Sequence, residues 1–497
     1  MLGACKRQLL FSMSDTSPPP KPPSPSLLDR ALYWAFVVSA CALCFIAGVT
    51  ANHFQMQSSI AITNALEGGK AYVKEFKEKR LNLVPEPTAE MRRQQHEDKM
   101  QALFANAQTE QLGDAFNGYT LVSTDQSTTV WLVDMQGKVM HQWNMPFSKA
   151  WPRATHVNAP MRRRIFVRTA YAYPNGDLLA QYEGVGDTPY GYGLLKMDKD
   201  SKLLWTYDQN AHDDFFVDEA DGDIYVLTQK VHKAIIVGLE ELSYPLVTDY
   251  IVRLTPDGQE ISTTSIAKAL KNSTFSSLLN PAFIRGEKWD HLHSTSIQKV
   301  SPAVAALNPA LKAGQMLVSL RNLNSLAIVD LKRNTVVWAQ MGPWKQQYAA
   351  RFLPNGNILA FDNLGLKAKE KYLSRLLEMS PQSTKIIWSY TESENPQFFT
   401  RLGGRVQTLP GGNILVTLAE RARVQEMTRA GNIVWRYTLP RRLKDDSADY
   451  PYAAIMNAHR FAADYFTFLP AREEVSKPAA TPAEKPSQST NKKVQTP

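Results

Sequence analysis

The pattern of hydrophobic and polar positions divides the chain into five stretches. Residues 1–30 are rich in proline and serine and predict a disordered segment. Residues 31–51 carry no charged side chain, and as a helix they are long enough to cross a hydrocarbon core of roughly 30 Å. Residues 52–115 mix dense charge with spaced apolar positions and predict a helical stalk or lid. Short apolar runs separated by turn residues fill residues 116–469, and a Pro/Ala/Lys/Ser tail, predicted to be disordered, covers residues 470–497.

Two patterns repeat between residues 116 and 469. The first is a turn followed by an apolar strand, and its Asn-Gly or Asp-Gly pairs favour tight hairpins because these residues tolerate positive φ. Its copies lie at residues 173–181, 219–227, 312–320, 352–361 and 408–417. The second is a strand, a polar turn and a strand that ends in an aromatic residue. Five of its copies contain a tryptophan at this end, Trp143, Trp205, Trp338, Trp388 and Trp435, and a sixth copy at residues 250–265 lacks one.

Six copies of a multi-strand unit predict an all-β fold, a six-bladed β-propeller. Each blade exposes an apolar face, and stacking against the next blade buries it. The repeated tryptophans are therefore predicted to pack blade against blade. The segment NAHRF at residues 457–461 is a candidate for part of a closing strand.

The apolar segment at residues 31–51 predicts a single transmembrane helix. Lys6, Arg7, Lys21 and Arg30 precede it, so the positive-inside rule places the N-terminus in the cytoplasm and residues 52–497 on the other side. The sequence GVTANH at its end matches a small-residue cleavage site poorly, which favours an uncleaved signal anchor over a cleaved signal peptide.

Composition excludes several classes of protein. The chain has 56 Lys+Arg against 47 Asp+Glu, a net charge of +9, but the basic residues form no stripe of the kind that binds nucleic acid. One long apolar stretch excludes a polytopic transporter. All three cysteines lie at or before Cys44, which excludes disulfides, cysteine zinc sites and a cysteine nucleophile from the strand region. A quinone-dependent propeller dehydrogenase would need more blades and often paired cysteines, and we predict no cofactor.

The segment WDHLHSTSIQ at residues 289–298 is the first candidate for chemistry. Imidazoles beside hydroxyls suit acid/base catalysis, oxyanion binding or nucleophilic attack by histidine. If the segment is a strand, His291 and His293 point to the same side. Two ligands are too few for a metal site, so no metal is predicted.

Several strings together resemble the bacterial arylsulfate sulfotransferase family. They are DHLHSTSI, GQMLVSLRNLNSLAIVDLKRNTVVWAQMG, FLPNGNILAFDN, SRLLEM and GGRVQTLPGGNILVT, and the resemblance runs over about residues 117–460. It implies a six-bladed propeller in the bacterial periplasm that moves a sulfuryl group from an aryl sulfate ester to a phenol without a nucleotide donor. It also implies a ping-pong mechanism through a sulfated histidine, with other His and Arg side chains at the central channel.

The resemblance carries over residue by residue. His293 falls on a family histidine, with Asp290 and Ser296 on its neighbours and Thr295 in place of an asparagine. Arg321 and Asn322 fall on an Arg-Asn pair, Arg375 on a Ser-Arg pair, and His212 resembles a residue of an earlier His-His-Asp segment. His293, Arg321, Arg375 and Tyr348 are the predicted catalytic residues. His212, Asn322 and Asp290 are the predicted substrate-binding residues.

Two departures from the family pattern keep a second hypothesis open. Tyr348 stands where the family has a channel histidine, and Thr400 and Arg401 stand where its sulfated histidine is expected. The first hypothesis is an enzyme anchored in the inner membrane that acts on an aryl or glycan sulfate ester. The alternative is a non-catalytic envelope propeller that binds a protein partner or an anionic polysaccharide.

Overall fold

The computed structural model describes residues 39, 43, 89–157, 165–184, 188–285, 289–368, 371–392, 398–440 and 454–470. From residue 92 onward the chain forms one compact unit. The predicted segments 1–30 and 471–497, most of the predicted stalk, and the predicted transmembrane helix apart from Ser39 and Leu43 lie outside this description. Within the described residues, no helix has the length and apolar character needed to cross a membrane.

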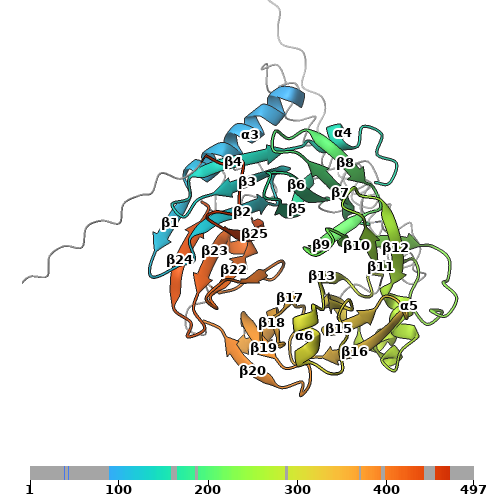
Figure 1. Ribbon diagram of the computed structural model, residues 1–497. Helices are drawn as coiled ribbons and strands as arrows, with labels where there is room; N and C mark the ends of the chain where they lie inside the picture. Colours follow the sequence, from blue (N-terminus) through green and yellow to red (C-terminus); the bar gives the residue numbers. More distant parts are fainter. Residues whose placement is uncertain are drawn as a thin grey trace, which may run out of the picture. The chain divides into compact units, whose positions relative to one another are not determined.

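Six sheets surround a central channel, each a blade of antiparallel strands (Figure 1). The first three blades, from the innermost strand outward, have these bounds: blade 1, β25 (Ile455–Ala462), β2 (Gly118–Thr124), β3 (Thr129–Val133) and β4 (Val139–Asn144); blade 2, β5 (Ile165–Ala172), β6 (Leu178–Gly184), β7 (Gly191–Met197) and β8 (Leu203–Tyr207); blade 3, β9 (Ala211–Val217), β10 (Ile224–His232), β11 (Leu246–Leu254) and β12 (Glu260–Ser265). The prediction of an all-β six-bladed propeller is confirmed.

The other three blades follow the same order from the channel outward. Their strands are: blade 4, β13 (Ser294–Lys299), β14 (Met316–Leu320), β15 (Ser325–Asp330) and β16 (Thr335–Met341); blade 5, β17 (Tyr348–Phe352), β18 (Ile358–Ala368), β19 (Lys371–Met379) and β20 (Ile386–Tyr390); blade 6, β21 (Arg405–Thr408), β22 (Ile414–Leu418), β23 (Arg423–Met427), β24 (Ile433–Thr438) and β1 (Gln108–Gln111). Short helices lie between strands: α4 (Phe147–Ala150), α5 (Ile266–Lys271), α6 (Pro302–Leu307), η2 (Ser276–Leu279), η3 (Pro281–Phe283), η4 (Arg321–Leu323) and η5 (Ala419–Arg421).

Both ends of the described chain close the ring between blades 6 and 1. The C-terminal strand β25 pairs with β2, so the predicted closing strand at residues 457–461 is confirmed. The N-terminal strand β1 adds an outer strand to blade 6 by pairing with β24. Helix α3 (Ala89–Ala105) precedes β1, and its Phe104 stacks on Trp131 with ring centroids 4.0 Å apart. The predicted helical segment therefore ends earlier than residue 115, because residues 108–111 find a sheet edge to pair with.

The repeated tryptophans join each blade to the next. Each indole N–H donates a hydrogen bond to a turn carbonyl of the following blade: Trp143 to Gly176 (2.9 Å), Trp205 to Pro256 (3.2 Å), Trp338 to Pro381 (3.0 Å), Trp388 to Arg429 (3.1 Å) and Trp435 to Met135 (2.9 Å). The predicted packing role is confirmed. An indole suits this position because it buries a large apolar area while its one donor finds a partner.

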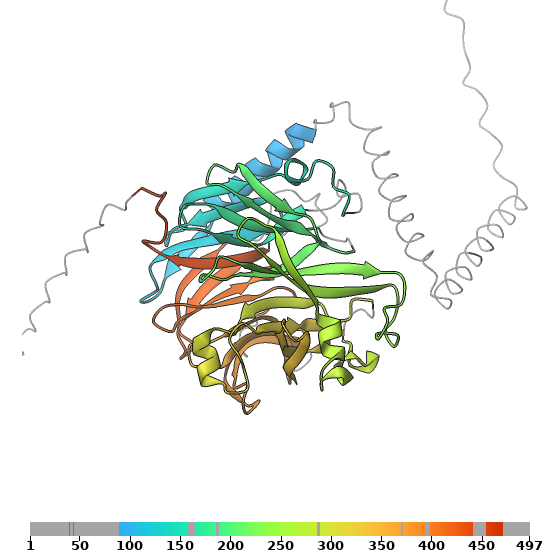
Figure 2. The same ribbon diagram turned by 45° about the vertical axis from the view of Figure 1, so that its right-hand side comes forward.

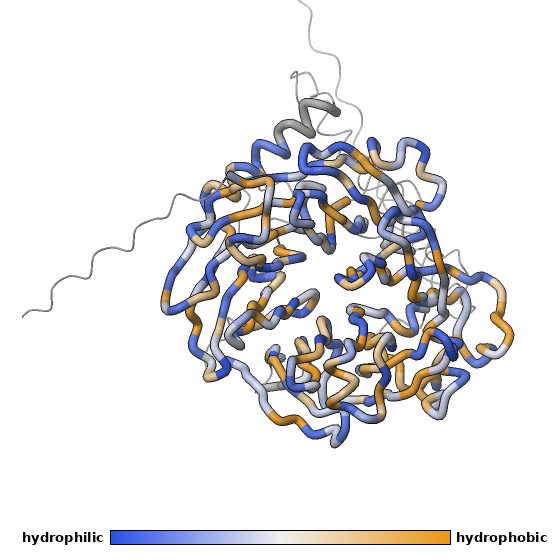
Figure 3. The backbone as a smooth tube through the Cα atoms, in the orientation of Figure 1, coloured by the Kyte–Doolittle hydropathy of each residue, from blue (hydrophilic) through white to orange (hydrophobic). Residues whose placement is uncertain are grey.

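The five turn-plus-strand copies are the hairpins between the first and second strands of blades 2 to 6. Gly176 and Gly356, for example, adopt φ of 89° and 81°, which a side chain would disfavour. The repeated turn thus returns each chain segment from the channel to the blade interior. Figure 3 shows the resulting alternation of apolar and polar residues around the ring.

Candidate functional site at the channel mouth

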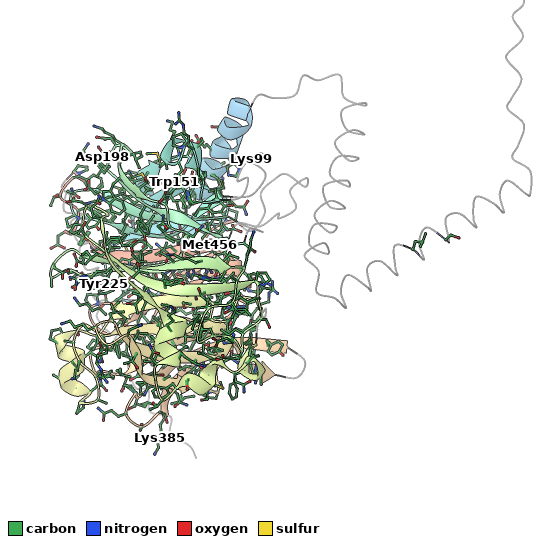
Figure 4. All side chains as sticks on the ribbon, turned by 90° about the vertical axis from the view of Figure 1, so that its right-hand side faces the viewer. Lys99, Trp151, Asp198, Tyr225, Lys385 and Met456 are labelled. Atoms are coloured by element: carbon green, nitrogen blue, oxygen red, sulfur yellow. The ribbon has the colours of Figure 1, made fainter. Side chains whose placement is uncertain are left out.

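The candidate site lies where the innermost strands begin. Five of these strands carry an irregularity at this level, at Arg168 in β5, between Ala211 and Phe215 in β9, at Thr295 in β13, at Ala349 in β17 and at Met456 in β25. A bulge leaves a residue unpaired and re-aims its side chain. Figure 4 shows Met456 within the body, whereas Asp198 and Tyr225 lie at its left-hand edge. We call the end of the channel at these bulges the mouth.

His293 is held by Asp290 from the loop before β13. Its Nδ1 lies 2.5 Å from Asp290 Oδ2, and its side chain keeps 17% exposure. Its backbone φ of 49° is left-handed, a conformation that costs a non-glycine residue about 1–3 kcal/mol and is concentrated at functional sites. A carboxylate on Nδ1 fixes the proton of the neutral ring there, and Nε2 lies 3.8 Å from Asp213 Oδ2, beyond hydrogen-bond distance.

Tyr190, from the connection between β6 and β7, covers His293. Its hydroxyl lies 3.2 Å from His293 Nδ1, 3.5 Å from Nε2, and 3.4 Å from Asp213 Oδ2, to which it donates. Burial, and then the nearby carboxylates of Asp290 and Asp213, raise the pKa of Tyr190 well above its ordinary value. The hydroxyl therefore stays protonated and acts as a hydrogen-bond donor.

Asp213, which accepts the Tyr190 hydroxyl, is also contacted by two basic side chains. Arg168 donates to its Oδ1 at 2.8 Å, and His212 Nδ1 lies 3.2 Å from its Oδ2. Burial would raise the pKa of Asp213, but Arg168 and His212 lower it below its ordinary value, so the carboxylate is ionised. Its charge is compensated by these two partners.

His212 is fully buried in the channel wall. Its Nε2 lies 3.8 Å from Asp249 Oδ1, so a carboxylate faces each ring nitrogen. Burial would lower the pKa of His212, but its bond to Asp213 and the charge of Asp249 raise it. This predicted substrate-binding residue is placed here as support for Asp213, with no exposed surface of its own.

Arg321 lies beside His293 on η4, since its backbone N–H donates to the His293 carbonyl at 3.1 Å. Its side chain donates to Asn322 Oδ1 and Gln346 Oε1, and its Nε is buried with no partner. Within the described part of the chain it faces no carboxylate closer than 4 Å. It is therefore the cation of the mouth whose charge is not already compensated.

Tyr348 lies between two guanidinium groups. The carbon Cζ of Arg168 is 5.5 Å from its ring centroid, and that of Arg321 is 5.7 Å. Burial raises the pKa of Tyr348, so its hydroxyl is a donor. Asn322 donates to the Asp290 carbonyl at 2.6 Å and so ties the His293 loop to η4. Of the seven predicted site residues, the structure thus brings six together.

Arg375 is the exception. On β19 it donates to Asp362 Oδ2 at 2.7 Å and to the Pro343 carbonyl at 3.2 Å. Asp362 in turn accepts the backbone N–H of Lys345 at 2.9 Å. Arg375 and Asp362 therefore hold the segment before Gln346, and Gln346 contacts Arg321. The charge of Arg375 is compensated by Asp362.

His291 and His293 do not share a side, contrary to the expectation for a strand. Strand β13 begins only at Ser294, and Asp290 makes an isolated bridge with Val247. His291 is 1% exposed, and neither of its ring nitrogens has a partner. In the described chain, no three His, Cys, Asp or Glu side chains are grouped so as to hold a metal ion.

Replacing His291 by leucine is expected to flatten the acid sensitivity of folding. Burial lowers the pKa of His291 from 6.5 to about 4. Between these values the unfolded chain binds more protons, so the free energy of unfolding falls as pH drops, by about 3 kcal/mol from this group. Urea unfolding at pH 7 and pH 4.5 measures this loss. A His291→Leu protein that loses as much stability as its parent over this range contradicts the prediction.

An ionic bridge crosses the channel beside the mouth. Asp214 on β9 accepts from Arg351 on β17 at 2.7 Å and from Arg405 on β21 at 3.0 Å, and it is 1% exposed. Blades 3 and 6 face one another across a six-bladed ring, so the contact between Asp214 and Arg405 spans the lumen. We call these three residues the channel bridge.

Sequence reasoning missed Tyr190, Arg168, Asp213 and the channel bridge. One pattern could have found the arginines. Arg168, Arg351 and Arg405 are each the charged residue of an otherwise uncharged first strand that leads to a Gly-containing turn. Nothing in the sequence around Tyr190 sets it apart from other loop tyrosines.

The sequence model of the family described as arylsulfotransferase (ASST) matches residues 170–439, more than half of the chain. The chain belongs to the arylsulfotransferase family. The matched range begins within β5 and ends after β24, so it contains His212, Asp290, His293, Arg321, Tyr348 and Arg375. The resemblance stated from the sequence is thereby confirmed. Comparison with curated proteins gave no match.

Solved structures similar to this arylsulfotransferase-family chain are distant. A protein of unknown function from Bacteroides caccae is 11% identical with a TM-score of 0.45, covering 69% of this chain and 99% of that one. A streptogramin B lyase is 10% identical with a TM-score of 0.39, covering 72% and 99%. A quinohemoprotein alcohol dehydrogenase from Comamonas testosteroni is 10% identical with a TM-score of 0.35, covering 66% and 68%.

Proposed function

We propose that this protein is a membrane-anchored periplasmic arylsulfotransferase, which moves a sulfuryl group from an aryl sulfate ester to a phenolic or other hydroxyl acceptor without a nucleotide donor. The observation that carries the proposal is the pair of His293 and Asp290 beside Arg321. It joins an oriented imidazole to a guanidinium without a carboxylate partner, within a family of sulfotransferases. The anchor is the apolar segment at residues 31–51.

His293 is the nucleophile of the first half-reaction. The lone pair of Nε2 forms a bond to sulfur while the bond between sulfur and the aryl oxygen breaks, and the aryloxide leaves with that electron pair. Covalent catalysis of this kind divides one difficult step into two easier ones. Asp290 holds the proton on Nδ1 and stabilises the positive charge that the ring gains, as a carboxylate does for a catalytic histidine.

Arg321, Tyr190 and Tyr348 hold the sulfuryl oxygens. A planar guanidinium presents a fork of donors to an oxyanion, and fixed donors in a buried site stabilise charge that builds in the transition state. Asp213 does not repel the anionic donor because Arg168 and His212 compensate its charge. Asn322 and Arg375 are positioning residues.

In the second half-reaction the acceptor hydroxyl oxygen attacks the sulfuryl group on His293. The bond between Nε2 and sulfur breaks, its electron pair returns to the imidazole, and the acceptor proton passes to solvent. The channel bridge crosses the lumen beside the mouth, and the first phenol leaves and the acceptor enters through this mouth. This order is what a ping-pong mechanism requires.

The other histidines fit the nucleophile role less well. His212 is fully buried and His291 is 1% exposed, whereas the His293 side chain keeps 17% exposure. His459 on β25 has Nε2 3.3 Å from the Gln407 amide nitrogen, which donates to it and occupies its lone pair. The non-catalytic alternative, a propeller that binds a partner or an anionic polysaccharide, is favoured by Tyr348 at the position of a family histidine.

Phenol-dependent release of nitrophenol from nitrophenyl sulfate by the purified full chain tests the proposal. Turnover that rises with phenol concentration, with parallel lines in double-reciprocal plots, supports sulfuryl transfer through a covalent intermediate. A folded protein that binds aryl sulfates or sulfated polysaccharide without turnover supports the binding alternative.

Replacing Arg321 by lysine is expected to lower kcat/KM for the aryl sulfate by about 10–100-fold. Lysine keeps the charge but loses the fork of donors, and a charge-assisted hydrogen bond is worth about 1.5–3 kcal/mol. The matched control is Arg375→Lys, in which the ion pair with Asp362 persists, and it should change kcat/KM much less. Steady-state kinetics of both variants decide, and equal losses would contradict the assignment of Arg321 as the anion clamp.

A further inference from the structure

Among the residues from 92 onward that the structure describes, the two most exposed large hydrophobic side chains lie on one loop. This loop, residues 233–245, joins β10 to β11, and we call it the rim loop. Ile235 is 63% exposed and Val237 is 88% exposed. Large apolar side chains that are exposed close together on one loop form an apolar surface patch, which indicates a contact site.

The rim loop is braced from within. The Ile236 N–H donates to the Tyr244 hydroxyl at 2.8 Å, and that hydroxyl donates to the Leu239 carbonyl at 3.2 Å. Leu239 and Leu242 are buried in the hydrophobic core of blades 3 and 4. The loop therefore has apolar anchors that point inward, and it still presents Ile235 and Val237 to solvent. Ile235 and Val237 are therefore exposed on a loop whose backbone is held by these hydrogen bonds and buried side chains.

The rim loop lies at the mouth end of blade 3. Strand β10 pairs antiparallel with β9, with Thr228 opposite Ala211, so the end of β10 beyond Thr228 is at the level where β9 begins. The N–H of Val247, just after the loop, donates to the Trp289 carbonyl at 2.7 Å, next to Asp290. Figure 2 shows this green hairpin reaching past the right-hand edge of the propeller, and in Figure 3 the loop at the right-hand edge is largely orange.

Basic residues lie at the base of the rim loop, where burial, and then the nearby charges of Lys230 and Lys268, lower the pKa of His232, the last residue of β10. Lys230, Lys233 and Lys268 are exposed on β10, the rim loop and α5. The acidic residues of the loop are Glu240 and Glu241, and Glu241 is paired with Lys271 at 3.0 Å. Exposed apolar side chains close to lysines match a bilayer that contains anionic lipids, where each lysine near the surface contributes to binding.

We propose that the rim loop inserts Ile235 and Val237 into an anionic lipid bilayer and so holds the mouth of the propeller at the membrane surface. The same chain contains the apolar segment at residues 31–51, which the sequence predicts to be a membrane anchor. The contact does not depend on the chemistry at His293. It would bring the mouth close to amphipathic donors or acceptors that partition into the bilayer.

Depth-dependent fluorescence quenching on the full chain tests this contact. A background with Cys5→Ser, Cys41→Ser and Cys44→Ser receives one cysteine, Val237→Cys, labelled with an environment-sensitive dye. The control position is Asp257→Cys, at the β11–β12 turn on the opposite end of blade 3. Both proteins are mixed with vesicles of phosphatidylcholine and phosphatidylglycerol in equal parts that contain a spin-labelled lipid.

The expected result is about threefold stronger quenching at position 237 than at 257, since inserted apolar residues sit about 5–10 Å into the headgroup boundary. Lys230→Gln with Lys233→Gln should weaken the quenching, and vesicles of phosphatidylcholine alone should do the same. Equal quenching at the two positions overturns the proposal.

A second pair of variants separates the membrane from other occupants. Ile235→Ser in the labelled Val237→Cys protein should reduce the quenching, whereas Ile386→Ser with Ile387→Ser, two exposed residues of β20, should not. If Ile235→Ser instead dissociates a dimer of the detergent-purified chain, the loop binds a second copy and the proposal is overturned. Nitrophenyl sulfate turnover with a soluble phenol should be unchanged, which distinguishes failure of this proposal from failure of the proposed chemistry.

Discussion

Replacing His293 by alanine is expected to lower aryl sulfate turnover by at least about 10⁴-fold, because loss of a catalytic nucleophile removes the covalent route. Asp290→Asn should lower kcat by a smaller factor, since the ring remains but its Nδ1 proton loses the carboxylate that orients it. Steady-state kinetics measure both effects. Rapid acid quench and mass spectrometry of the parent enzyme should find one sulfuryl group on the peptide that contains His293.

His459→Ala is the matched control, because His459 is also on an inner strand but has its Nε2 occupied by Gln407. It should retain most of the activity. Unfolding curves of the variants exclude loss of fold as the cause. Turnover that survives His293→Ala and disappears in His459→Ala would place the nucleophile at His459 and refute the assignment.

Asp214→Asn is expected to lower the free energy of unfolding by about 3–5 kcal/mol, because it leaves Arg351 and Arg405 with no carboxylate inside the channel. Asp214 also accepts the backbone N–H of Ile297 at 3.1 Å, so its loss weakens the contact between blades 3 and 4. Urea unfolding measures the change. Arg351→Met in the Asp214→Asn background should recover part of the stability, since one unpaired buried cation is removed.

The matched control is Glu241→Gln, which removes an exposed ion pair with Lys271. Pairs of this kind contribute about 0–1 kcal/mol, so its unfolding curve should nearly coincide with that of the parent. An Asp214→Asn protein as stable as this control would mean that the channel bridge does not hold the ring together.

The candidate site was partly accessible from the sequence. His293, Asp290, Arg321, Asn322 and Tyr348 lie in strings that match a family, and the structure gathers them at one level of the channel. Arg375 lies in such a string too, yet Asp362, thirteen residues earlier, takes its charge through the pairing of β18 with β19. A match to a family motif locates a residue along the chain, but it does not show which neighbouring side chain will compensate its charge.

Tyr190 shows the opposite case. It is 103 residues from His293 in sequence, and only the stacking of blades 2, 3 and 4 around the mouth brings the two rings to a centroid distance of 5.4 Å. Asp214 and Arg405 are 191 residues apart and meet across the lumen. Contacts of this kind have no local pattern, because the residues that make them belong to different repeats.

The sequence by itself determined the six-bladed propeller, the five glycine-containing hairpins, the closing strand and the packing role of the tryptophans. These features depend on the two-residue period of strands and on turn chemistry, which act between residues close in the chain. Only the tertiary structure decided which charges are compensated, which histidine keeps exposure at the mouth, and which charged residues meet across the lumen. Those properties depend on the burial and partners that arise when separate blades meet, because the cost of a buried charge is set by its neighbours in space.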